Sequence, residues 1–265
     1  MNGQTRAVHG TAAQAKSGSH RMLGLALGGG GALGAAHVGV LRALHEAGLA
    51  PRVVVGTSAG SLVGAAYAAG LSPSQIDAAV RGAEWSMFGR LRPSPRLGLL
   101  DSSALLETID RLGGEPLIET LPRRFAAIAT DLRTRQAVIL DRGRLGIALR
   151  ASIAVPGIFP PIVVGDQILV DGGLAANLPI AAAQQLGATF TIAVRIRPEW
   201  DRIPAMRSTR RIAALEASPD VLMIRPKLNG LSQWSRADVP QIIDTGYVAA
   251  RTALEVWKGQ RDRVA

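Results

Sequence analysis

The fold class can be read from residues 23–60, which run LGLALGGGGALGAAHVGVLRALHEAGLAPRVVVGTSAG. The short apolar run at 23–27 is typical of a buried strand, and the glycines after it lead into a helix predicted over 32–47. The pattern then repeats, because the apolar run at 53–55 is followed by the turn 56–60 and a helix of small residues. Two consecutive strand–loop–helix units predict an α/β fold with parallel strands.

The rest of the chain continues this alternation. Further strands are predicted at 125–130, 136–140, 167–170, 189–195 and 221–224, and further helices at 73–84, 102–112, 145–153, from 179 onward and at 240–258. Residues 85–100 and 197–211 are expected to be irregular loops. Residues 1–21 lack the apolar centre of a signal peptide, so we expect a mobile tail followed by one domain over residues 22–265.

The composition narrows the class of protein. The chain of 265 residues is 48% hydrophobic and has no Cys, which excludes thiol catalysis and Cys-ligated metal centres. The net charge of +10 suits peripheral contact with an anionic membrane, whereas the scarcity of aromatic residues beside the Arg residues argues against nucleic acid as a partner. The uncharged windows 22–41 and 53–76 are too rich in Gly, Ala and Ser for membrane spans, so we expect a cytoplasmic protein. The oligomeric state is left open.

The first glycine cluster admits two interpretations. Gly29, Gly31 and Gly34 satisfy the Gly-x-Gly-x-x-Gly pattern of dinucleotide-binding loops. Such a loop requires an acidic residue near the end of the second strand, and the first Asp in the chain is Asp77. The cluster is therefore better suited to a general anion site, in which backbone N–H groups at a helix start bind a phosphate or a developing oxyanion.

The second glycine cluster matches the nucleophile elbow Gly-x-Ser-x-Gly, with Gly56, Ser58 and Gly60 at the three fixed positions. An elbow forces the Ser into a strained backbone conformation, so the residues two before and two after it need to be nearly free of side chain. The alternative is a glycine-rich turn with an incidental Ser. The position between a Val-rich strand and a helix of small residues favours a nucleophile at Ser58.

A histidine base for Ser58 is disfavoured by the order of residues. All four His residues precede Ser58 and no Asp precedes Asp77, so no known order of a Ser–His–Asp triad can form, and His37 is expected to be a packing residue. A carboxylate base remains, and Asp171 and Asp131 both follow predicted strands, where sites of parallel sheets gather. For Asp171 a simple turn residue is the competing interpretation. No cluster of His or acidic residues indicates a metal, and no cofactor is expected.

Several motifs, taken in their order along the chain, resemble the patatin-like phospholipase family. They are Gly29–Gly34, Gly56–Gly60, Ala127–Arg133, Arg150–Pro161, Asp171–Gly173 and the longer stretch Leu169–Pro179. The resemblance covers about residues 22–195 and is greatest to compact bacterial members and to the catalytic domain of neuropathy-target-esterase-like lysophospholipases. It implies a three-layer α/β/α sandwich with a mainly parallel sheet. It also implies Ser58 as nucleophile, Asp171 as base and an oxyanion hole formed by the amides of Gly29, Gly30, Gly31 and Ala32.

One position departs from the family pattern, because Leu33 stands where Arg or Lys is usual. The sequence thus predicts a serine acyl hydrolase of (lyso)phospholipids or related lipid esters. Two alternatives remain open. One is thioester hydrolysis or acyl transfer from acyl-CoA by the same two residues, and the other is a non-catalytic lipid- or protein-binding module.

Overall fold

The structure is a computed structural model that describes residues 22–83, 90–94, 98–101, 116–196, 209–232 and 237–262. The tail predicted at 1–21, the helix predicted at 102–112 and most of the loop predicted at 197–211 lie outside these residues. Within the described residues, no helix combines the length and the apolar character needed to cross a membrane.

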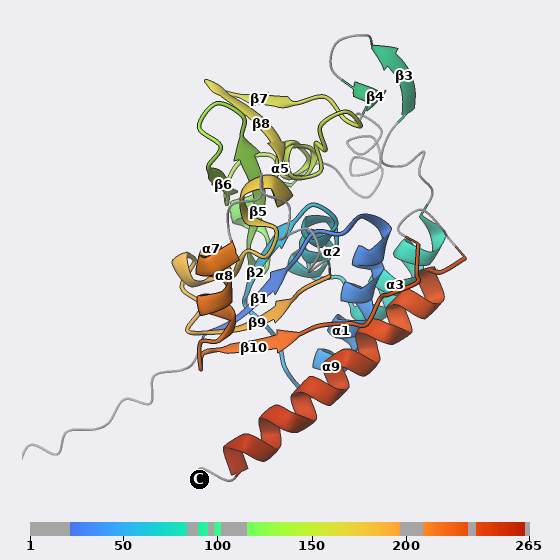
Figure 1. The fold of residues 1–265 in the computed structure, drawn as a ribbon, viewed down its shortest axis with the longest axis vertical. Helices are drawn as coiled ribbons and strands as arrows, with labels where there is room; N and C mark the ends of the chain where they lie inside the picture. Colours follow the sequence, from blue (N-terminus) through green and yellow to red (C-terminus); the bar gives the residue numbers. More distant parts are fainter. Residues whose placement is uncertain are drawn as a thin grey trace, which may run out of the picture.

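In the described part of the chain, the main sheet is made of eight strands (Figure 1). Its strands are β1 (Leu23–Leu27), β2 (Val53–Thr57), β5 (Arg124–Asp131), β6 (Ala137–Leu140), β7 (Ile162–Val164), β8 (Gln167–Asp171), β9 (Phe190–Val194) and β10 (Val221–Ile224). The described helices are η1 (Gly31–Ala35), α1 (Ala36–Glu46), α2 (Ala59–Ala68), α3 (Pro73–Gly82), η3 (Ile118–Thr120), α5 (Leu145–Ser152), α6 (Gly173–Ala176), α7 (Ile180–Gln185), α8 (Thr209–Glu216) and α9 (Val239–Asp262).

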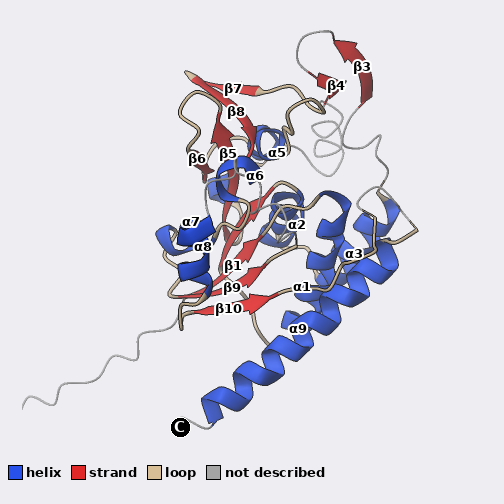
Figure 2. Ribbon diagram, in the orientation of Figure 1, coloured by secondary structure: helices blue, strands red, loops and turns tan. Residues whose placement is uncertain are grey.

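The predicted three-layer arrangement is confirmed (Figure 2). Strands β10, β9, β1, β2 and β5 are consecutive parallel neighbours, and the remaining three pair antiparallel at the β5 end. Alternate residues of each strand face opposite layers. Thus Val54 belongs to the core cluster that includes residues of α1, α2 and α9, whereas Val53 and Val55 belong to the cluster that includes residues of α7.

Several details differ from the sequence-based expectations. Helix α8 begins at Thr209, inside the stretch 197–211 that was predicted to be a loop, and the short helices α6 and η3 were not predicted. The first helix begins with the 3-10 turn η1, because Gly31 takes a positive φ of 58° and the chain winds tightly before α1. The stretch predicted to be irregular at 85–100 includes the antiparallel pair β3 (Arg90–Ser94) and β4 (Gly98–Asp101). The short strand β7 was not predicted, because three residues are too few for a periodic pattern.

Strands β2 and β8 lie on the same edge of β5, and this arrangement determines where the site forms. Residues 127–128 of β5 pair with both β2 and β6, and residues 129–130 pair with both β6 and β8. A strand has only two edges, so β2 and β8 must share the edge opposite β6. They approach each other end to end, because β2 runs parallel to β5 and β8 runs antiparallel to it.

Helix α9 lies against α1, and two glycines allow the backbones to come close (Figure 1). A Cβ atom at Gly246 would lie 2.1 Å from the Ala36 carbonyl oxygen, and one at Gly39 would lie 1.9 Å from the Ile243 carbonyl oxygen. No side chain fits at either position. Because α1 follows η1 directly, α9 also supports the helix that carries the glycine loop.

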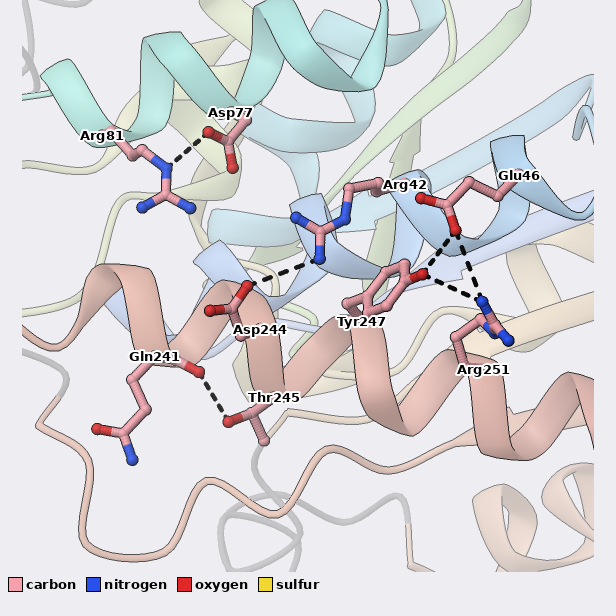
Figure 3. Close-up of polar contacts among 9 residues, drawn as sticks. All are labelled: Arg42, Glu46, Asp77, Arg81, Gln241, Asp244, Thr245, Tyr247 and Arg251. Atoms are coloured by element: carbon pink, nitrogen blue, oxygen red, sulfur yellow. Dashed lines mark hydrogen bonds and ion pairs between the residues drawn. The ribbon is translucent and has the colours of Figure 1, made fainter.

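Polar contacts surround this helix pair (Figure 3). The Tyr247 hydroxyl donates a hydrogen bond of 2.6 Å to Glu46, and the Arg42 guanidinium lies over the Tyr247 ring at 4.0 Å from its centre. Arg42 also forms an ion pair of 3.6 Å with Asp244, and Arg251 donates to the Tyr247 hydroxyl. These contacts are exposed, so each contributes little on its own. Their joint effect is to fix the rotation of α9 on α1.

Candidate active site

Ser58 occupies the sharp bend between β2 and α2. Its backbone has φ 53° and ψ −124°, a conformation that L-residues seldom adopt. A Cβ atom at Gly56 would lie 2.3 Å from the Gly60 carbonyl oxygen, and one at Gly60 would lie 2.3 Å from the Leu27 carbonyl oxygen. Gly56 is therefore required by the tight turn of the elbow on itself, and Gly60 by its close crossing over the end of β1. This is the geometry that the Gly-x-Ser-x-Gly pattern predicts.

The strained bend is held by neighbouring serines. The Ser58 N–H donates a hydrogen bond of 2.9 Å to Oγ of Ser152, a buried residue at the end of α5. The Ser61 hydroxyl donates a hydrogen bond of 2.6 Å to the Ser58 carbonyl oxygen. Both backbone groups of Ser58 are thus engaged, and its hydroxyl lies close enough to the Asp171 carboxyl to lower the pKa of that carboxyl.

Asp171 reaches Ser58 along the shared edge of β5. Thr57 lies opposite Ile128 and Asp171 lies opposite Ala129, so the residue that follows Thr57 meets the end of β8. The expectation that Asp171 ends a parallel strand is wrong, because β8 is antiparallel to β5. The chain turns away sharply at Gly172, where a Cβ atom would lie 2.2 Å from the Ile128 carbonyl oxygen.

The Asp171 carboxyl is buried and only partly hydrogen-bonded. Its Oδ1 accepts a hydrogen bond of 2.7 Å from the Gly173 N–H, and its Oδ2 has no partner among the described residues. Burial raises the pKa of this carboxyl from 3.8 to about 6, against the smaller lowering by the Ser58 hydroxyl and the Gly173 N–H. At pH 7 the carboxylate is therefore mostly ionised, and it is a stronger base than an exposed Asp.

The competing carboxylate, Asp131, is bound within its own turn. Its Oδ1 accepts a hydrogen bond from the Arg133 N–H at 2.9 Å, and its carbonyl oxygen accepts from the Arg135 N–H at 2.7 Å. It lies opposite Leu169, two residues further along β5 than the position opposite Asp171. This arrangement is an Asx turn that caps β5, which leaves Asp171 as the carboxylate nearest the elbow.

The glycine loop lies beside the elbow. A Cβ atom at Gly29 would lie 3.2 Å from the Ser58 Cβ and 2.7 Å from the Asn177 Oδ1. The Gly29 N–H donates to both the carbonyl oxygen and the Oδ1 of Asn177, each at 3.2 Å, so it is already engaged. The N–H groups of Gly30, Gly31 and Ala32 stand at the start of η1, where helical turns leave donors unpaired, and they form no hydrogen bond with the described residues.

The buried His37 side chain contacts the first residue of the glycine loop. Burial lowers the pKa of its imidazole to about 4, so the ring is neutral at pH 7, and its Nε2 lies 2.8 Å from the Gly28 carbonyl oxygen. Because a carbonyl only accepts, the ring proton resides on Nε2. His37 thus holds the base of the loop. Leu33, at the position where the family usually has a basic residue, is buried in the core.

Sequence reasoning missed two residues of this site. Ser152 and Asn177 both lie inside the quoted family motifs, but neither was assigned a role. The Ser152 hydroxyl accepts a hydrogen bond from the Ser58 N–H, and the Asn177 side chain accepts one from the Gly29 N–H. These two residues come close to Ser58 and Gly29 only because of the way the chain folds around β5, and no local sequence pattern predicts that tertiary arrangement.

Together these features define an α/β protein whose serine stands at a strained strand-to-helix bend beside a buried carboxylate. Residues 25–183 match the family model "Patatin-like phospholipase". The chain belongs to the patatin-like phospholipase family, a class of lipid acyl hydrolases.

Relatives with known sequences agree with this assignment. An uncharacterised NTE family protein of Mycobacterium tuberculosis, Rv1063c, is 37% identical over 186 residues, which cover 70% of this chain and 52% of the relative. Patatin-like phospholipase domain-containing protein 6 of Mus musculus is 35% identical over 281 residues, which cover 89% of this chain and 21% of the relative. The chain thus spans about half the length of the mycobacterial relative and a smaller part of the mouse protein.

Two solved structures share the fold at low sequence identity. VipD from Legionella pneumophila matches with a TM-score of 0.55 and 14% identity, over 89% of this chain and 67% of that chain. The type III effector protein ExoU matches with a TM-score of 0.50 and 16% identity, over 89% of this chain and 53% of that chain. These likenesses support the α/β/α architecture.

Proposed function

We propose that this protein hydrolyses fatty-acyl esters of lysophospholipids, phospholipids or related lipids, with Ser58 as nucleophile and Asp171 as base. The observation that carries the proposal is the meeting of β2 and β8 on one edge of β5. That arrangement brings a strained Ser and a buried carboxylate with a free Oδ2 to the same point. The lipid substrate class is supported by membership of the patatin-like phospholipase family.

In the first half of the reaction the Ser58 Oγ attacks the acyl carbonyl carbon, and its proton passes to Oδ2 of Asp171. The tetrahedral oxyanion is bound by the free N–H groups of Gly30, Gly31 and Ala32, while the engaged Gly29 N–H holds the loop in place. Removal of one such donor typically raises a barrier by about 2.7–4 kcal/mol. As the tetrahedral adduct collapses, Asp171 returns the proton to the departing alcohol, and an acyl-serine remains.

In the second half a water molecule attacks the acyl-serine and gives its proton to Asp171. Collapse of the second tetrahedral adduct releases the fatty acid and restores the Ser58 hydroxyl with the same proton. A base with a pKa near 6 suits both directions of this transfer, because it is ionised before attack and acidic enough to protonate the leaving group. No imidazole takes part.

The test is a substrate panel of lysophospholipid, phospholipid, triacylglycerol and acyl-CoA, assayed with the wild-type protein, Ser58→Ala and Asp171→Asn. We expect release of fatty acid from the glycerolipids by the wild type and loss of activity of at least about a hundredfold in each variant. Preferential turnover of acyl-CoA would instead favour a thioesterase or acyltransferase. Equal turnover by all three proteins would refute the assigned residues, and no turnover of any substrate by the wild type would favour a binding module.

A further inference from the structure

Three apolar side chains form a row on one face of the β7–β8 hairpin and of the residue that follows β5, where no described helix covers the sheet. Leu132 follows β5 and donates its N–H to the Ile168 carbonyl oxygen at 2.8 Å, and Ile168 lies opposite Val163 in the β7–β8 hairpin. Residues that lie opposite one another in antiparallel strands project from the same face. Leu132, Ile168 and Val163 thus form one continuous row across three segments, which we call the hairpin row.

The hairpin row is exposed, in contrast to the other face of the same hairpin. Leu132 is 49% exposed, Val163 is 70% exposed and Ile168 is half-buried. On the opposite face Leu169 is fully buried and packs with Ala129 and Ala151. Strands β7 and β8 extend past α7 at the side of the molecule away from α9 (Figure 1). The hairpin therefore has one core face and one apolar face that no described element covers.

Basic residues adjoin the hairpin row. Arg133 and Arg135 are exposed in the turn that follows Leu132, and the Arg133 guanidinium donates to the Asp166 carbonyl oxygen at the hairpin tip. This contact joins the turn to the tip, so the apolar row and its charges lie on one surface. The exposed charges of this surface are those of Arg133, Arg135 and Asp166, because the Asp131 side chain in the same turn is buried. Two guanidinium groups therefore face the solvent beside one carboxylate.

We propose that the hairpin row with Arg133 and Arg135 is a docking surface for an anionic lipid bilayer. A shallow apolar surface flanked by guanidinium groups matches the interfacial region of such a bilayer, where apolar side chains enter the acyl boundary and Arg side chains meet the headgroups. The net charge of +10 on the chain adds a long-range attraction to the negatively charged bilayer. The assignment does not depend on the catalytic residues.

The test is co-sedimentation with vesicles of equal parts phosphatidylglycerol and phosphatidylcholine, compared with vesicles of phosphatidylcholine alone. All proteins carry Ser58→Ala, so that vesicle hydrolysis cannot alter the result. We expect binding to the anionic vesicles that weakens with added salt. The pair Leu132→Gln and Val163→Gln should lower the vesicle affinity about tenfold, since both apolar side chains would leave water on docking.

Charge variants give effects of opposite sign. Arg135→Asn should weaken binding to the anionic vesicles several-fold, and Asp166→Asn should strengthen it by a similar factor, at about fivefold per charge. Asn is chosen at position 135 because the backbone there has φ 58°, which Asn tolerates. The phosphatidylcholine vesicles should show neither effect.

The matched control is the pair Val248→Gln and Val256→Gln on α9, where the two side chains are 60% and 57% exposed. This control should bind the anionic vesicles like the parent protein, and thermal unfolding should confirm that both double variants are folded. Equal affinity of the hairpin and α9 variants would overturn the proposal. The proposal would also be overturned if the parent protein did not bind anionic vesicles. A parent protein that is a dimer, and that the hairpin variants convert to a monomer, would overturn it as well.

Discussion

Asp171→Asn should stabilise the folded protein at neutral pH, although it is expected to abolish activity. The substitution keeps the shape of the side chain and the acceptor for the Gly173 N–H, and it removes the buried charge. The Asp171 pKa rises from 3.8 in the unfolded chain to about 6 in the folded protein. A carboxyl with a raised folded pKa is most favourable when protonated, so its ionisation destabilises the fold as the pH increases.

The magnitude follows from the difference of about 2 pH units between the two pKa values. At about 1.4 kcal/mol for each unit, ionised Asp171 lowers the free energy of unfolding by about 3 kcal/mol above pH 7. The cost begins near pH 4, where the unfolded chain ionises, and is nearly complete by pH 7, about one unit above the folded pKa. For a chain of this size the variant should melt roughly 5–10 °C higher than the wild type at pH 8.

The assay is urea unfolding of wild type and Asp171→Asn at pH values from 4 to 8. Comparison of the two proteins is required, because buried His37 has the opposite dependence. Its pKa falls from 6.5 to about 4 on folding, so its contribution to stability is present above pH 6.5 and is lost as the pH falls towards 4. His37 is unchanged in the variant and cancels in the difference. A stability difference that does not change between pH 4 and pH 8 would refute the buried, shifted carboxyl.

Three further outcomes are expected. The kcat/KM of the wild type for a soluble ester should increase with pH through an apparent pKa near 6, since Asp171 must be ionised to accept the proton, and a profile flat from pH 5 to 8 would contradict this role. Ser152→Ala should lower kcat roughly tenfold or more with little change in KM, because the buried Ser58 N–H loses its acceptor; steady-state kinetics with Ser152→Thr as the conservative control would test this. Gly246→Ala should destabilise the protein by about 2 kcal/mol in urea unfolding, whereas Gly259→Ala in the same helix meets open space and should be neutral or slightly stabilising.

The parallel half of the sheet and the elbow could be predicted from local sequence. Apolar runs that end in glycine identified β1 and β2, and the Gly-x-Ser-x-Gly spacing identified the bend at Ser58. These features are local, because the strain at Ser58 and the close crossings at Gly56 and Gly60 require particular residues at fixed spacing. Such requirements can therefore be recognised in the local amino-acid sequence.

The pairing of Ser58 with Asp171 could not be derived from spacing. It depends on β8 turning back antiparallel to β5 and ending opposite Ala129, and nothing in the residues of 167–171 distinguishes a parallel from an antiparallel strand. The same holds for the engagement of Gly29 by Asn177, which narrows the free loop amides to those of Gly30, Gly31 and Ala32. Contacts between segments that are far apart in sequence can be identified only when the pairing of the strands in the sheet is known.

The most direct test of the account is phosphonylation of the protein by a fluorophosphonate, followed by mass spectrometry of the modified peptide. The account predicts one adduct, on Ser58, and a labelling rate that falls by about a hundredfold in Asp171→Asn. An adduct on any other residue, or labelling of Asp171→Asn at the rate of the wild type, would contradict it.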